Sequence, residues 1–199
     1  MRNTIILAIL LIFLVGCSTQ KDSTDTTKVT KTISGTTDLI LDEQDLNQLG
    51  MTKDLDEQEL QELGIASGTN CWTDKEYSNI VDSTLGQYSI CAYKLGETQI
   101  IIELKKFANK EALDGSYQYD SSHYFSAEGL ISENTFGDQS KFRVNNENDY
   151  GGQYNQKGIY YYHLWICKDL YLIHITSKGP DQVKENIADI GQRILSKFN

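Results

Sequence analysis

At residues 159 to 177 the chain reads Ile-Tyr-Tyr-Tyr-His-Leu-Trp-Ile-Cys-Lys-Asp-Leu-Tyr-Leu-Ile-His-Ile-Thr-Ser, and this stretch decides the fold. Aromatic and β-branched residues fill both halves around a polar break, which predicts an antiparallel hairpin. A symmetric loop at Lys168-Asp169 would set His163 opposite His174 and Trp165 opposite Leu172. One face of this hairpin then carries Tyr160, Tyr162, Leu164, Ile166, Tyr171, Ile173 and Ile175.

The segment after this hairpin is expected to be a helix that covers it. Its apolar residues recur at helical spacing, at Val183, Ile187, Ile190, Ile194 and Phe198. Pro180 is placed to open the helix, since proline is favoured in the first turn. The apolar stripe should lie on the apolar face of the sheet, with Gly191 permitting close approach.

Further strands precede the central hairpin. Residues 87–95 and 98–107 alternate around a Gly96-Glu97 turn and predict a second hairpin. A helix should start at Asn109, and residues 129–145 suggest two short strands. The fold class expected is therefore α+β, an antiparallel sheet of about five to six strands covered by the C-terminal amphipathic helix.

Two short acidic helices should precede the sheet, because residues 41–52 and 55–66 repeat at an offset of 14. Each copy begins with an N-cap aspartate, Asp42 or Asp56, and ends at a glycine, Gly50 or Gly64. We interpret their acidic residues mainly as a solvated face that complements the helix dipoles. An acidic docking surface or a weak calcium site is the alternative.

The N-terminus indicates export. An apolar run of 11 residues, Ile5 to Val15, is too short to span a bilayer but fits the core of a secretory signal. It ends in Leu14-Val-Gly-Cys17, which resembles the lipobox of prokaryotic lipoproteins. This resemblance implies cleavage after Gly16 and a lipid on Cys17, which would be the membrane contact of the mature protein.

The expected domain organisation follows from these features. Residues 1–16 are the lipoprotein signal peptide, and 17–37 are a flexible tether in which 11 of the last 20 positions are Ser or Thr. Residues 38–66 hold the acidic two-helix repeat, and 67–199 form the α+β domain. The protein is expected on the outer face of the cell membrane, or on the outer membrane if the host is a diderm bacterium.

Three cysteines remain after Cys17, and in an oxidising compartment at least one disulfide is expected. We favour Cys71 with Cys91, which would staple an irregular segment onto the first strand. Pairing of either cysteine with Cys167 stays open.

The composition and motifs argue against several functions. A net charge of −10 is unsuited to nucleic-acid binding by a basic face. His163 and His174 could bind a metal if Cys167 joined them, and His123 adjoins serines, but neither arrangement forms a recognised site. We therefore expect no catalytic residue, no metal and no cofactor.

The order of elements from about residue 80, with its tyrosine-rich hairpin and terminal helix, resembles the PsbP-like α+β domains of uncharacterised prokaryotic surface lipoproteins, archaeal ones among them. The resemblance implies a fold and no catalytic residues. The function expected is a lipid-anchored binding or accessory module for an unknown protein or small ligand. The alternative is a surface hydrolase or metal-dependent enzyme that uses His123 or the paired histidines.

Overall fold

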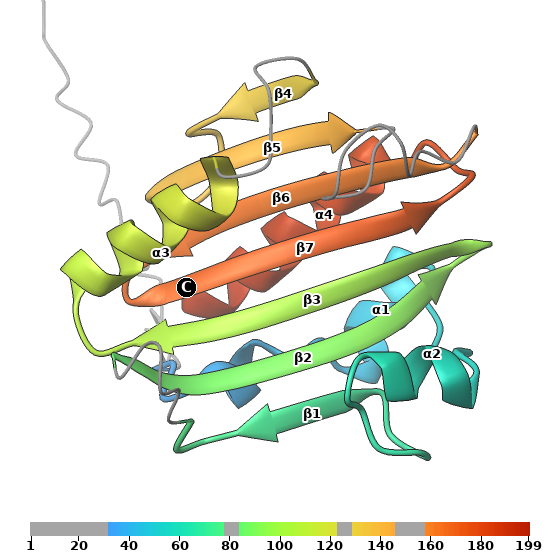
Figure 1. Cartoon of the computed structure of the whole chain (residues 1–199), viewed down its shortest axis with the longest axis horizontal. Helices are drawn as coiled ribbons and strands as arrows, with labels where there is room; N and C mark the ends of the chain where they lie inside the picture. The colour runs from blue at the N-terminus through green and yellow to red at the C-terminus, as the bar shows by residue number, and fades with distance from the viewer. Residues whose placement is uncertain (1–31, 78–83, 123–128, 146–157) are drawn as a thin grey trace, which may run out of the picture.

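The computed structural model describes residues 32–77, 84–122, 129–145 and 158–199. A seven-stranded antiparallel sheet lies at its centre, in the order β1-β2-β3-β7-β6-β5-β4 (Figure 1). The strands are β1 Cys71–Asp74, β2 Leu85–Leu95, β3 Thr98–Phe107, β4 Leu130–Glu133, β5 Gln139–Asn145, β6 Tyr160–Lys168 and β7 Tyr171–Gly179. The α+β class is confirmed. The sequence estimate of five to six strands missed β1, because four residues are too few to display an alternating pattern.

Helices cover both faces of the sheet. In the described residues the helical segments are η1 Thr36–Leu39, α1 Glu43–Leu49, α2 Glu57–Glu62, α3 Lys110–Ser122, α4 Lys184–Leu195 and η3 Ser196–Phe198. Figure 1 shows α1 and α4 behind the sheet, and α2 and α3 in front of it. None of these helices is long and apolar enough to cross a membrane.

The predicted C-terminal helix packs on the predicted face. Its stripe from Val183 to Ile194 is buried against the apolar side chains of β6 and β7, in the largest core cluster. A Cβ on Gly191 would come within 2.9 Å of Leu164 Cδ2, so the glycine does permit close approach. The helix begins at Lys184 rather than at Pro180. Residues before it are held to the sheet instead, since the Thr98 hydroxyl donates to Asp181 at 3.0 Å.

The register of the central hairpin differs from the expected one. Lys168 pairs with Tyr171, so that Asp169 and Leu170 form the turn, and the partner of His163 is Thr176 instead of His174. Asp169 adopts a positive φ of 53°, which aspartate tolerates. The Asp138 carboxylate accepts bonds from Lys168 Nζ and the Asp169 amide, both at 2.9 Å, and fixes the turn there. Because the shift in partner is two residues, every side chain keeps its predicted face.

The two helices of the acidic repeat pack on opposite faces of the sheet beside β2. Both aspartate caps are present: Asp42 and Asp56 each accept a backbone N–H three residues ahead at 2.8 Å. α1 lies on the α4 side, where its Asp45 binds Lys197 Nζ at 2.7 Å. α2 lies on the opposite side, where Leu60 joins a cluster with Ile90 and Ala92 of β2. Between the two helices the chain crosses the sheet edge at Thr52, which pairs with Lys94.

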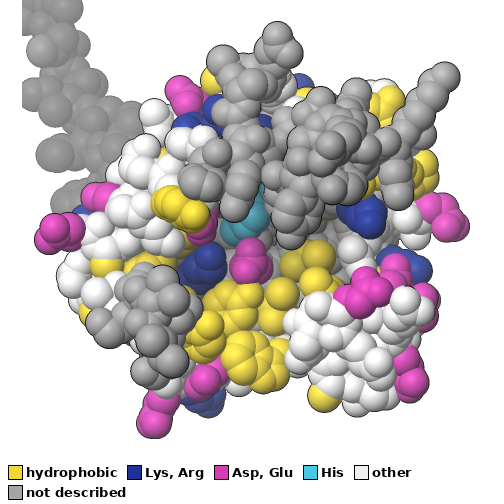
Figure 2. Space-filling model, in the orientation of Figure 1, with side chains coloured by type: hydrophobic (Ala, Val, Ile, Leu, Met, Phe, Trp, Pro, Cys, Tyr) yellow, Lys and Arg dark blue, Asp and Glu magenta, His cyan; other side chains and the backbone are white. Residues whose placement is uncertain are grey.

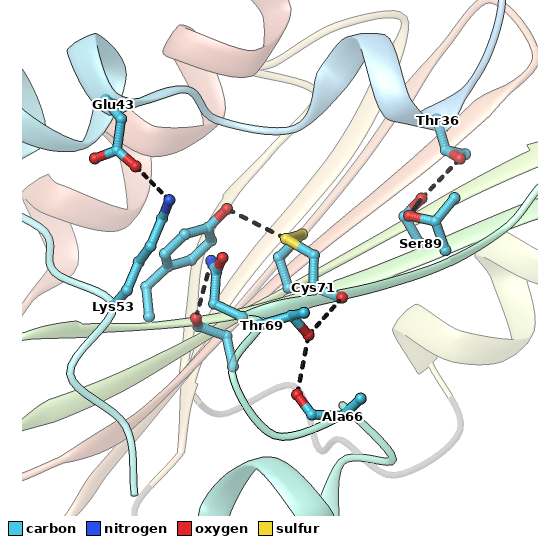
Figure 3. The surroundings of a disulfide bond; sticks show 12 residues. Thr36, Glu43, Lys53, Ala66, Thr69, Cys71 and Ser89 are labelled. Carbon is cyan, nitrogen blue, oxygen red and sulfur yellow. Dashed lines mark hydrogen bonds and ion pairs between the residues drawn. A yellow bond between two sulfur atoms is a disulfide. The ribbon is translucent and has the colours of Figure 1, made fainter. Parts of the chain in front are cut away.

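A disulfide between Cys71 and Cys91 joins β1 to β2, where the two residues are direct cross-strand partners. Figure 3 shows its surroundings, including a pair of hydroxyls in which Ser89 donates to Thr36 at 2.8 Å. Thr36 is only 1% exposed. The last residues of the segment that we assigned to a flexible tether, 17–37, are therefore part of the folded domain.

Candidate functional site

The front face of the sheet carries polar side chains at its centre. Two apolar clusters cover its two ends: one under α3, with Trp165 and Cys167, and one under α2, with Ile90 and Ala92. Histidine, acidic and basic side chains gather between them (Figure 2). Strands β2, β3, β7 and β6 supply these groups, because alternate residues of neighbouring strands point to the same face.

Four of these residues form a hydrogen-bonded chain, which we call the relay: Tyr88, Glu103, His174 and His163. The Tyr88 hydroxyl donates to Glu103 Oε1 at 2.6 Å. His174 Nδ1 lies 3.0 Å from Glu103 Oε2, and His174 Nε2 lies 3.3 Å from His163 Nδ1. The relay thus links a carboxylate to a buried imidazole two strands away.

Trp165 holds the two histidine rings in place. It is directly opposite His174, and its ring stacks on both imidazoles at 11° between planes, with centroids 4.6 Å from His174 and 5.3 Å from His163. Trp165 is 1% exposed and His163 6% exposed. Stacking against a buried indole restricts the rotation of both imidazoles and so preserves the geometry of the relay.

The environment fixes the charges along the relay. Burial and the charge at His174 lower the pKa of His163 to about 3, so this ring is neutral near pH 7. Burial opposes ionisation of Glu103, but the bond from His174, the charge of Lys105 and the bond from Tyr88 outweigh it and hold the pKa of Glu103 well below its usual range. Burial and the neighbouring Glu103 carboxylate raise the pKa of Tyr88, which remains a donor.

Lys105 extends the polar group towards α3. Its ammonium lies 3.1 Å from Asp120 of that helix. Burial opposes its charge, but the nearby Glu103 and Asp120 carboxylates raise the pKa of Lys105 above the ordinary value. On the other side, the Tyr88 ring contacts Trp72 and Tyr77, with centroids 5.7 and 5.4 Å away. The relay therefore lies between an ion pair and an aromatic cluster.

A cavity of about 180 Å³ adjoins the His163 end of the relay. It is lined by Gln99, Ile101, Tyr161, His163, Thr176, Ser177 and Lys178. Small-molecule sites in proteins combine such a concavity with a few oriented polar groups. His163 thus connects the wall of this cavity to the relay.

The structure brings together only some of the residues considered in the sequence. His163 and His174 are in contact, although not as direct cross-strand partners. Cys167 is buried beneath α3, and burial raises the pKa of its thiol to about 12. Among the described residues, no three His, Cys, Asp or Glu side chains are grouped so as to hold a metal ion. His123 and the lipidation residue Cys17 lie outside the described residues.

Sequence reasoning missed Tyr88, Glu103 and Lys105. The sequence did contain a signal for Glu103, because it is the single acidic residue of its strand and interrupts an apolar stretch, Ile-Ile-Ile-Glu-Leu. A carboxylate in the middle of a central strand needs a partner, and histidines on a neighbouring strand are suitable ones. Tyr88 had no such signal among twelve tyrosines.

Comparison with known proteins adds little to this description. No protein-family model matches the chain, and no curated protein shows significant sequence similarity to it. Among solved structures, the chain is similar to the extracellular domain of PknH from Mycobacterium tuberculosis, with 11% identity and a TM-score of 0.44. The alignment covers 80% of this chain and 97% of that domain. So distant a likeness carries no functional argument.

Proposed function

We propose that this chain is an exported surface protein that a lipid on Cys17 holds to the outer face of a membrane, and that its folded domain binds a ligand or partner. The Leu14-Val-Gly-Cys17 stretch supports the anchor. The disulfide between Cys71 and Cys91 supports export, since such bonds persist in oxidising compartments. The order of its elements also resembles that of PsbP-like domains in surface lipoproteins, which is consistent with this proposal.

The observation that carries the binding role is the way in which hydrogen bonds and ring stacking hold the imidazoles of His163 and His174. His163 and His174 are hydrogen-bonded to each other, His174 is also bonded to Glu103, both rings stack against Trp165, and His163 lines a cavity. A cavity wall that contains a ring held so firmly keeps one shape for a bound molecule. The buried thiol of Cys167 is unsuited to act as a nucleophile there, because burial raises its pKa to about 12.

A surface hydrolase is the second candidate function, and one cross-strand pair between β6 and β7 favours it. Thr176 is directly opposite His163, and both line the cavity. A hydroxyl beside an imidazole that is itself oriented through His174 and Glu103 has the components of nucleophilic catalysis. This candidate predicts turnover of ester or amide substrates that the Thr176→Val variant lacks.

The anchor is tested by detergent phase partitioning and lipid labelling of the protein expressed in a bacterial host that processes lipoproteins. The wild type should enter the detergent phase and incorporate labelled fatty acid, whereas Cys17→Ala should do neither. Cys167→Ala is the matched control and should behave as the wild type. Equal labelling of the wild type and Cys17→Ala would exclude the anchor.

The binding role is tested separately by native mass spectrometry of the purified mature protein and by a panel of hydrolase substrates. A small molecule or protein that co-purifies with the wild type, and that is lost in His163→Gln, would support binding. Turnover that Thr176→Val abolishes would favour the hydrolase instead.

A further inference from the structure

A second cavity, of about 390 Å³, lies where β7 begins, on the back face of the sheet that α1 and α4 cover. Tyr171 of β7 and Lys106 of β3 both line it, and they are direct cross-strand partners on that face. The C-terminal end of the chain lies beside the start of β7 (Figure 1), where the Phe198 ring meets the Tyr171 ring edge-on, with centroids 5.6 Å apart. None of the relay residues lines this cavity, which is on the opposite face of the sheet.

Two opposite charges line this cavity without pairing with each other. Within the described part of the chain, neither the Lys106 ammonium nor the Asp169 carboxylate makes an ion pair. Lys106 Nζ donates to the Ser34 carbonyl at 2.7 Å and lies 5.6 Å from the centroid of the Tyr171 ring. An ammonium has three N–H donors, so this bond leaves two for a bound molecule. Asp169 is exposed, and only its amide is engaged, by Asp138.

The hydroxyl of Tyr171 is a third polar group at this place. Tyr171 is 4% exposed, and its buried hydroxyl makes no hydrogen bond with any described residue. Burial, together with the charges of Asp38 and Asp169, raises the pKa of Tyr171, so the hydroxyl keeps its proton and remains a donor. Buried polar groups in proteins nearly always have a partner, because an unmade bond costs the desolvation of the group. A ligand with an acceptor would supply the missing partner.

The arrangement of these groups selects the chemistry of the occupant. A simple anion would meet the like charge of Asp169, and a simple cation would meet that of Lys106. A molecule that carries both charges compensates both residues, through charge-assisted hydrogen bonds. The remaining walls are apolar, from Ile33, Leu170 and Phe198, and would bury an apolar side chain. The volume falls within the range of about 300 to 1,000 Å³ that is usual for small-molecule sites.

We infer that this cavity binds a free amino acid with an apolar side chain. The carboxylate of the ligand pairs with Lys106 and accepts a bond from Tyr171, the ammonium pairs with Asp169, and the side chain packs against Phe198. The inference goes beyond the proposed function, because it assigns a second site on the other face of the sheet. It depends neither on the cavity beside His163 nor on the lipid anchor.

The test is isothermal titration calorimetry at pH 7 on the mature protein with Cys17 replaced by Ser, so that no detergent competes for the apolar walls. The probes are L-phenylalanine and L-leucine. Two analogues of phenylalanine each lack one charge: 3-phenylpropionate has no ammonium, and 2-phenylethylamine has no carboxylate. An amino acid should bind saturably with one molecule per chain, and each analogue should bind about tenfold more weakly or less, because it loses one charge-assisted bond.

The variant Tyr171→Phe separates binding from packing. It removes a hydroxyl that makes no hydrogen bond in the protein, so urea unfolding without ligand should show no loss of stability. The affinity for the amino acid should nevertheless fall about tenfold, because the bond to the ligand is lost. An unchanged affinity in Tyr171→Phe would remove this residue from the site.

Charge variants complete the test. Lys106→Met and Asp169→Asn should each weaken binding about tenfold, and asparagine preserves the positive φ of the turn. Lys184→Met and Asp54→Asn change exposed residues that do not line the cavity and should leave the affinity unchanged.

Three results would overturn the inference: no saturable binding of either amino acid, equal affinity for phenylalanine and both analogues, or equal affinity in the cavity variants and their controls. A co-purifying ligand that is lost in His163→Gln and retained in Lys106→Met would support the proposed function alone. The failure of one site is therefore distinguishable from the failure of the other.

Discussion

Reducing the disulfide between Cys71 and Cys91 should lower the free energy of unfolding by about 3 kcal/mol. The two residues are separated by 20 positions, and closing a loop of that length in the unfolded chain costs about 3 kcal/mol of entropy at 25 °C. The disulfide joins the edge strand β1 to β2, and without it β1 is held to β2 by four cross-strand pairs. The same change should follow in the Cys71→Ala/Cys91→Ala double variant.

The assay is equilibrium urea unfolding followed by tryptophan fluorescence, on mature protein in which Cys17 is replaced by Ser. The two tryptophans report on different regions, because Trp72 lies on β1 and is 38% exposed while Trp165 lies in the core. In a Trp72→Phe background, Trp165 alone reports global unfolding. With slopes of about 2 to 3 kcal/mol per molar urea, reduction should lower its midpoint by about 1 M or more.

The decisive comparison is between the two tryptophans. If reduction left the Trp165 midpoint unchanged and altered only the Trp72 signal, β1 would detach locally and the loop-entropy argument would be refuted. Cys167 offers an internal control. It is buried with a raised pKa, so a thiol reagent should not modify it in the native protein and should detect it once urea unfolds the chain.

Three further predictions concern stability. First, the pKa of His163 falls from an ordinary 6.5 to about 3 on folding, so the unfolded chain binds more protons than the folded protein between these pH values. The free energy of unfolding should therefore drop by up to about 1.4 kcal/mol per pH unit as the pH falls below 6.5. Urea titrations of the His163→Gln variant at pH 7, 6 and 5 should lack this slope. Second, Gly191→Ala should destabilise the protein by about 1 kcal/mol, because overpacking against Leu164 and Ile166 exceeds the gain in helix propensity. A Cβ on Gly115 in α3 meets no atom within 4 Å, so Gly115→Ala should stabilise the protein by about 0.5 to 1 kcal/mol. The melting temperatures of the two variants should therefore shift in opposite directions. Asp42→Ala and Asp56→Ala each remove an N-cap and should each cost about 1 kcal/mol in urea unfolding, and a negligible loss at either position would show that the side-chain cap is dispensable there.

Local patterns predicted much of this fold because they depend on residues close together in the chain. The caps at Asp42 and Asp56, the alternation in the two hairpins and the stripe from Val183 to Ile194 are all local, and each appears in the structure. The register of the central hairpin was predicted two residues away from its position. The reason is a contact from outside the hairpin, since Asp138 holds Lys168 and Asp169 in the turn.

The candidate site shows the same division. The sequence singled out His163 and His174 and could assign them to one face of a strand pair. It could not find Glu103 and Tyr88, which reach the histidines only because β3 lies next to β7 in the sheet order. That neighbour relation joins strands more than 60 residues apart, as the 71-residue separation of Glu103 and His174 illustrates.

By itself, the sequence determined the short-range features: the apolar run from Ile5 to Val15, the strand and helix periods, the capped acidic repeat and the excess of negative charge. Only the tertiary structure decided that the two copies of the repeat lie on opposite faces of the sheet, and that a carboxylate, two imidazoles and an indole meet at its centre. The physical reason is that side-chain period and capping depend on neighbours a few residues away, whereas strand order and register are fixed by packing and hydrogen bonds between distant segments.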